Sequence, residues 1–177
     1  MVEEAELIHK VEEWRKKANS ETDAFDRYVS IFIGYNIFYN LYEKKKKNDL
    51  NVDFLSGDSR RAIAVLELSN SAQLFDEISA DLNKYLRIIP MFNEEYWPDG
   101  KRGSRGLPIA ETLKTAFQNR DKKKTIELLA KWLYKVRCNL VHGVKSYEDA
   151  NQRELLQRSA ILLDEILVHL LVRYNST

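Results

Sequence analysis

The sequence contains little cysteine, proline or glycine. Its 177 residues include one cysteine (Cys138), three prolines and six glycines. A single thiol cannot form an internal disulfide or build a cysteine-rich zinc site, so the fold depends on neither. A chain of this length can bury about 70% of its unfolded surface, which is enough for a core without such supports. The scarcity of proline and glycine leaves few points where helices must end.

The sequence also lacks a strong excess of either charge. Lys and Arg total 28, Asp and Glu total 27, and the net charge is +1. The overall field of such a chain does not attract nucleic acid. Any nucleic-acid binding therefore has to come from a local basic patch.

Long hydrophobic runs are missing as well. No apolar stretch approaches the roughly 20 residues that span a bilayer. The first six residues, Met1 to Glu6, are acidic and do not have the basic-then-apolar layout of a signal peptide. We therefore expect a cytoplasmic protein that makes no membrane contact.

What the sequence does contain is helical periodicity. Apolar residues recur three and four positions apart almost throughout, and no period-two run suggests a strand. We expect one domain over residues 1–177, an all-α, up-down helical bundle with long second and last helices. The predicted helices cover 2–18, 23–46, 58–68, 71–88, 109–119, 122–141 and 147–174. Ser20 or Thr22 is expected to cap the second helix, and residues 90–108 are expected to break the pattern.

One segment combines groups that can carry chemistry. Arg137 is followed five positions later by His142, Asn139 lies between them, and Gly143 can stop the helix. A guanidinium can hold two phosphate oxygens at once, and a histidine can act as a base near neutral pH. On an ideal helix these two side chains point about 140° apart. They can converge only if the helix ends before His142, and Gly143 favours such an end.

This pattern resembles the HEPN family, whose motif is an arginine, four to six residues, and a histidine. The stretch from Phe32 to Tyr39, which contains Asn36, is similar to the aromatic second helix of many such proteins. The resemblance covers roughly residues 23–174. It implies a HEPN-like helical bundle that acts as a metal-independent endoribonuclease without a cofactor. Arg137 and His142 would be catalytic and Asn139 supporting.

The resemblance also implies partners. HEPN proteins act as homodimers, often as toxins held by a nucleotidyltransferase antitoxin or in antiviral defence. RNA or a nucleotide would be the ligand. Lys145, three residues past His142, and the basic residues of the 99–106 segment are candidate contacts to the RNA backbone. That segment supplies Lys101, Arg102 and Arg105.

Other interpretations of the same residues remain open. Nuclease members usually have a polar residue directly after the arginine, whereas this chain has Cys138 there and an asparagine one position later. A non-catalytic member that binds a nucleotide, RNA or a protein is therefore an alternative, as is a purely structural helical module. Arg137 could instead form an ion pair with a neighbouring helix. Asn36 could be a core amide with its hydrogen bonds satisfied.

Overall fold

The computed structural model describes residues 2–50, 57–88, 107–141 and 150–176, and these ranges are helical with no strand among them. This confirms the all-α prediction. The helices of the described ranges are α1 (Val2–Ser20), α2 (Ala24–Leu50), α3 (Asp58–Ala64), the 3₁₀ turn η1 (Val65–Leu68), α4 (Ser71–Ile88), α5 (Leu107–Gln118), α6 (Lys122–Val141) and α7 (Ala150–Tyr174).

The start of α2 differs from the prediction. Asp23, and neither Ser20 nor Thr22, caps the helix. Its Oδ1 accepts the backbone N–H groups of Phe25 at 2.8 Å and Asp26 at 3.1 Å. Ser20 still belongs to α1, where its hydroxyl donates to a carbonyl of the preceding turn at 2.7 Å. The aspartate satisfies two N–H groups that would otherwise lack partners in the first turn.

The predicted break over residues 90–108 is wrong at its end. Leu107 and Pro108 lie in the first turn of α5. A proline is tolerated there because the first turn has no intrahelical use for its missing N–H. The rest of that segment lies outside the described residues, as do Gly143 and residues 147–149 of the predicted last helix.

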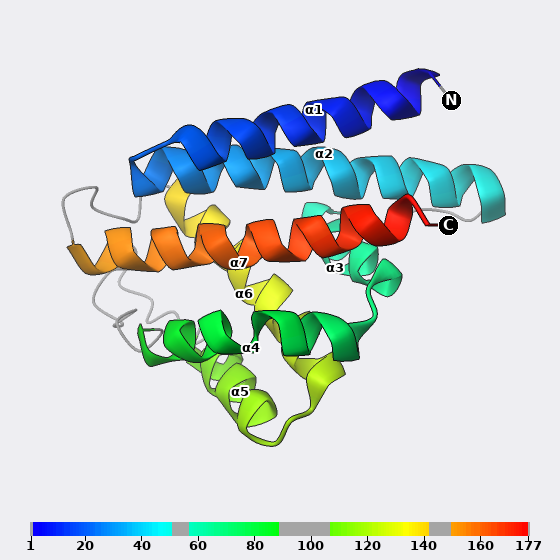
Figure 1. Ribbon diagram of the computed structural model, residues 1–177. Coiled ribbons are helices and arrows are strands. Elements are labelled where there is room, and N and C mark those ends of the chain that lie inside the picture. Colours follow the sequence, from blue (N-terminus) through cyan, green and yellow to red (C-terminus); the bar gives the residue numbers. More distant parts are fainter. Residues whose placement is uncertain (1, 51–56, 89–106, 142–149, 177) are drawn as a thin grey trace.

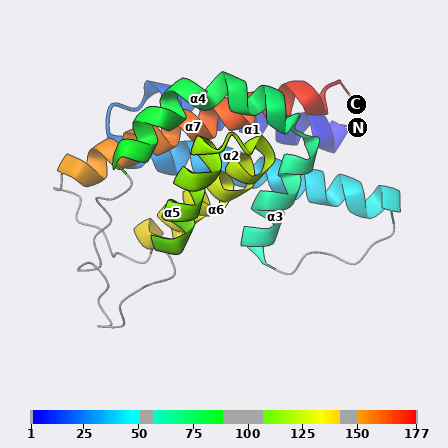
Figure 2. The same ribbon diagram turned by 90° about the horizontal axis from the view of Figure 1, so that it is seen from below.

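The long helices lie side by side. In Figure 1, α1 and α2 run antiparallel, α7 lies along α2, and α4 follows α7 on the side away from α1. Seen from below in Figure 2, α5 and α6 pack together beneath α4, and α3 lies beside them. In the described ranges, no helix has both the length and the hydropathy needed to cross a membrane.

A buried hydrogen-bond network ties three of these helices together. The Tyr85 hydroxyl on α4 accepts the indole N–H of Trp132 on α6 at 2.8 Å. It also lies 2.9 Å from the hydroxyl of Ser159 on α7, which is fully buried. Pairing buried polar groups in this way avoids the cost of leaving them without partners. The network fixes how α6 sits against α4 and α7.

Gly34 in the middle of α2 lies where α1 and α7 both pass close. A Cβ at this position would lie 3.4 Å from both the Val11 carbonyl oxygen and the Trp14 Cβ, and 3.6 Å from the Leu167 Cδ2. A side chain larger than a methyl group would therefore push these helices apart. The glycine lets α2 form the centre of the three-helix layer.

Candidate functional site

The last turns of α6 bring Arg137 against α2. Its guanidinium lies over the Phe32 ring, 5.7 Å from the ring centre. Tyr134, one turn earlier on the same face of α6, packs on the same ring with the centroids 6.2 Å apart. Arg137 is half-buried, and among the described residues no carboxylate forms an ion pair with it. The expected alternative, an ion pair with a neighbouring helix, is therefore not found in this part of the chain.

Asn139 is not brought to Arg137. Asn139 is 8% exposed and lies among the buried positions of α6. Two positions apart on a helix, the side chains point about 160° away from each other. Asn139 therefore lies on the packed side of α6, while Arg137 lies on the side that meets Phe32.

The other predicted site residues belong to ranges whose structure is not described. These are His142, Lys145, Lys101, Arg102 and Arg105. Their assignments stay predictions. The described part of α6 ends at Val141, directly before the histidine.

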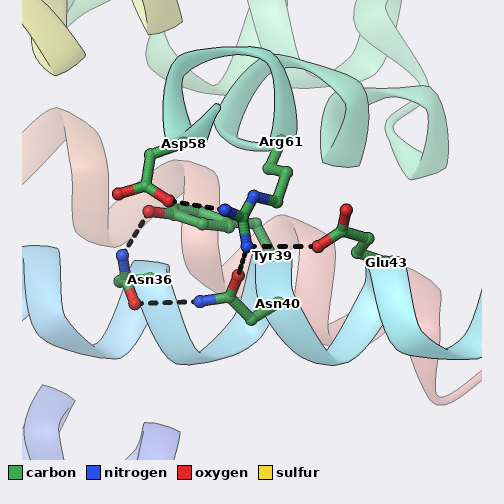
Figure 3. A network of polar contacts seen from close by, with 6 residues as sticks. All are labelled: Asn36, Tyr39, Asn40, Glu43, Asp58 and Arg61. Atoms are coloured by element: carbon green, nitrogen blue, oxygen red, sulfur yellow. Dashed lines mark hydrogen bonds and ion pairs between the residues drawn. The ribbon is translucent and has the colours of Figure 1, made fainter. Parts of the chain in front are cut away.

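A polar network lies on the neighbouring part of α2 and joins it to α3 (Figure 3). The amide of Asn36 donates to the Tyr39 hydroxyl, and Asn40 donates to the Asn36 Oδ1 at 3.0 Å. Arg61 on α3 donates in turn to the Asn40 Oδ1 at 2.8 Å. The hydrogen bonds therefore run in one direction, from the guanidinium to the phenol. Asn36 is an amide with both ends bonded.

Two carboxylates neutralise Arg61. Its Nη1 lies 3.3 Å from the Glu43 Oε2, and its Nη2 lies 3.1 Å from the Asp58 Oδ1. Figure 3 shows the guanidinium between these two groups. Arg61 thus links α2 to α3. Arg137 has no such partner in the described chain, so it can take an external anion at lower cost.

The network and the α6 motif share one electrostatic neighbourhood. Tyr39 is buried, and burial raises the pKa of its hydroxyl above the usual range. The Asp58 carboxylate adds to this rise in pKa, whereas the Arg137 and Arg61 guanidinium groups oppose it. Burial likewise raises the pKa of Tyr134, and Arg137 again opposes the rise. The aromatic stretch of α2 and the arginine of α6, about 100 residues apart in sequence, therefore meet in space.

Sequence reasoning missed most of the network. Asn40, Glu43, Asp58, Arg61 and Tyr134 were not singled out. The available signals were local: Asn36 and Asn40 stand four apart on one helix, and Asp58 and Arg61 stand three apart. No pattern in the sequence indicates that α3 folds back onto this face of α2.

The described part of the candidate site offers a guanidinium group beside aromatic side chains. In the part of the chain that the structure describes, no three His, Cys, Asp or Glu side chains gather closely enough to hold a metal ion. Cys138, next to Arg137, is a free, half-buried thiol. Arg137 is half-buried beside Phe32 and Tyr134. Its guanidinium can bind an anion such as phosphate, and the edge of an aromatic ring then lies near that anion.

Comparison of the chain with protein-family models, with curated proteins and with solved structures finds no match.

Proposed function

We propose that this chain is a HEPN-type, metal-independent endoribonuclease that acts as a homodimer. The strongest support comes from the surroundings of the Arg137 side chain. It is half-buried against Phe32, has no carboxylate partner among the described residues, and stands five positions before His142. A guanidinium in this environment suits a phosphate oxygen, because binding one breaks no ion pair with a described residue.

The reaction follows from these groups. His142 takes the proton of a ribose 2′-hydroxyl, and the 2′-oxygen attacks the adjacent phosphorus. Arg137 stabilises the negative charge that builds up on the phosphate oxygens. The bond from phosphorus to the 5′-oxygen breaks, and that oxygen receives a proton. The products are a 2′,3′-cyclic phosphate and a free 5′-hydroxyl.

The chemistry gives a reason to expect a dimer. Each chain supplies a single motif histidine, His142, and one imidazole cannot act as base and acid at the same moment. Two chains related by a two-fold axis would bring two arginines and two histidines to one cleft. Lys145, Lys101, Arg102 and Arg105 would bind the RNA backbone beside it. We further propose that the activity serves as a toxin in a toxin–antitoxin or defence system, with a nucleotidyltransferase as a candidate antitoxin.

A second candidate is a non-catalytic HEPN-like module that binds RNA or a nucleotide. Cys138, half-buried directly after Arg137, favours it. A thiol is a weak hydrogen-bonding group in a position where nuclease members usually have a stronger one. The burial of Asn139 on the other side of α6 leaves no evident substitute for that group.

The test compares substitutions in the purified protein and in cells. Incubation with RNA should give cyclic-phosphate ends, and the rate should fall about 100-fold or more in Arg137→Ala and in His142→Ala. His9→Ala is the matched control, because His9 is exposed on α1 with its side chain 74% accessible. His169 is a poor control because it is buried.

The outcomes separate the candidates. Loss of cleavage and of growth inhibition in both site variants, with His9→Ala active, supports the nuclease. RNA binding without cleavage, weakened in Arg137→Ala, supports the binding module. Cleavage that is unchanged in His142→Ala would overturn the proposed mechanism.

A further inference from the structure

A groove lies between α4 and α7, away from Arg137. Its volume is about 330 Å³, in the range of small ligand sites. Its walls carry both acidic and apolar side chains. The residues that matter here are Glu77, Asp164, Glu165, Val168, His169 and Val172.

The two valines give the groove an exposed apolar rim. Val168 is 37% and Val172 is 61% exposed, and they are the large hydrophobic residues that stand exposed in the described chain. Four residues apart, they lie on one face of α7. Single exposed valines are ordinary, and here the pair places apolar surface directly beside the acidic wall of the groove.

Two buried polar atoms in the groove wall have no hydrogen-bond partner among the described residues. The Nδ1 of His169 lies 2.8 Å from the Glu77 Oε2, and in the tautomer whose Nδ1–H donates to this carboxylate the Nε2 is an acceptor. His169 is 5% exposed, and its Nε2 has no partner in the part of the chain that the structure describes. The Oε2 of Glu165, one turn earlier on α7, is also buried without a partner. A ligand that carries N–H donors would therefore satisfy these two atoms of the groove wall.

The charges around Glu165 favour a cation. Burial raises its pKa to about 7, and the carboxylates of Asp81, Asp164 and Glu77 add to the rise in pKa, while Lys84 opposes it. Asp164 is paired with Arg15 at 2.7 Å, and Lys84 is paired with Asp81 at 2.8 Å. Arg173, at one end of the groove, donates to Gln73 at 2.6 Å. These basic groups are already engaged, and among the described residues no cation forms an ion pair with Glu165.

We propose that this groove is a docking site for a protein partner, and that it takes an arginine side chain flanked by an aliphatic residue. The guanidinium supplies several N–H donors in one plane, which matches the acceptors of Glu165 and His169. The neighbouring aliphatic side chain covers Val168 and Val172. The volume of the groove admits one such pair of side chains. The proposal is independent of RNA cleavage.

The probe is N-acetyl-leucyl-arginine amide, and its control is the citrulline counterpart, which has the same shape and no charge. Binding is followed by NMR through the methyl signals of Val168 and Val172 in the full chain. We expect the arginine probe to shift these signals and the citrulline probe to bind at least about tenfold more weakly. Glu165→Gln should produce the same loss, whereas Glu111→Gln, on exposed α5 surface, should not.

Three results would overturn the proposal. They are no shift at millimolar arginine probe, equal binding of the citrulline probe, and unchanged binding in Glu165→Gln. Sedimentation of the unliganded chain tests the other occupant, a second copy. If the chain is a dimer that Val172→Asp converts to a monomer, the groove is a self-interface and not a partner site.

Discussion

At the scale of single residues, the guanidinium groups of Arg61 and Arg137 both act on Tyr39 but have different surroundings. Arg61 contacts Asn40, Glu43 and Asp58, while Arg137 contacts the Phe32 ring and no carboxylate in the described chain. Removal of Arg61 leaves two carboxylates without their cation. Removal of Arg137 takes away an aromatic contact and, among the described residues, no ion pair.

Stability and RNA binding should therefore separate in the two variants. We expect Arg61→Ala to lower the free energy of unfolding by about 2 kcal/mol, because Glu43 is largely buried. Arg137→Ala should lower it by less than about 1 kcal/mol and abolish RNA binding or cleavage. Urea denaturation and an RNA-binding assay measure the two effects. A large stability loss in Arg137→Ala would mean that this arginine serves the fold.

Glu165 makes stability depend on pH. Its pKa is about 7 in the folded chain, mainly because of burial, against an ordinary value of 4.5. The folded state therefore holds a proton that the unfolded state releases between these two values. Stability from this group is present at low pH, is lost as the pH rises from about 4.5 to about 7, and does not change above that.

Glu165→Gln should remove this part of the pH dependence. The variant should match the parent near pH 4 and be more stable by about 1 to 2 kcal/mol at pH 8, a value reduced for partial solvent exposure. Denaturant unfolding at a series of pH values measures the difference, with Glu111→Gln as control. Parallel stability curves for parent and Glu165→Gln would show that Glu165 ionises normally.

At the scale of helices, the end of α5 is held by a residue in an unusual conformation. Arg120 has a φ of 55°, which is left-handed, and its backbone N–H donates to the Phe117 carbonyl at 3.0 Å. The next N–H, of Asp121, donates to the Ala116 carbonyl at 2.9 Å. Glycine adopts this conformation without the steric cost that a Cβ imposes.

Arg120→Gly should therefore stabilise the protein. We expect a gain of about 0.5 to 1 kcal/mol, because the relief of left-handed strain exceeds the added freedom of the unfolded chain. Thermal unfolding measures it, and Arg120→Ala, which removes the same side chain but keeps the Cβ, is the control. A destabilised Arg120→Gly would show that the arginine side chain makes a contact worth more than the strain.

The helices themselves could be predicted from the sequence because apolar spacing reports which face is buried. The ends of α4 and α6 agree with the prediction, since clear polar and apolar positions mark them. Caps were harder to predict. Several residues near Asp23 can cap a helix, and the choice depends on where the turn between α1 and α2 closes. Pro108 falls in the predicted break, although the first turn of a helix accepts proline.

At the scale of the molecule, the candidate site was predictable only in part. The sequence singled out Arg137 and the aromatic stretch of α2, and the structure brings the two together at Phe32. Residues such as Arg61 and Glu77 could not be found in this way. Their roles come from the docking of α3 on α2 and of α4 on α7, which no local pattern encodes.

A composite site across two chains can be tested with mixed dimers. The proposed mechanism uses His142 from both chains, one as base and one as acid. Refolding equal amounts of parent and His142→Ala gives about one quarter parent dimers and about one half mixed dimers. If the two histidines act in one cleft, the mixed dimers are inactive and the mixture keeps about a quarter of the parent activity. The matching control is parent mixed with His9→Ala, which should keep full activity. If each chain cleaves RNA alone, the mixed dimers are half active and the mixture keeps about half of the parent activity, which would rule out a shared cleft.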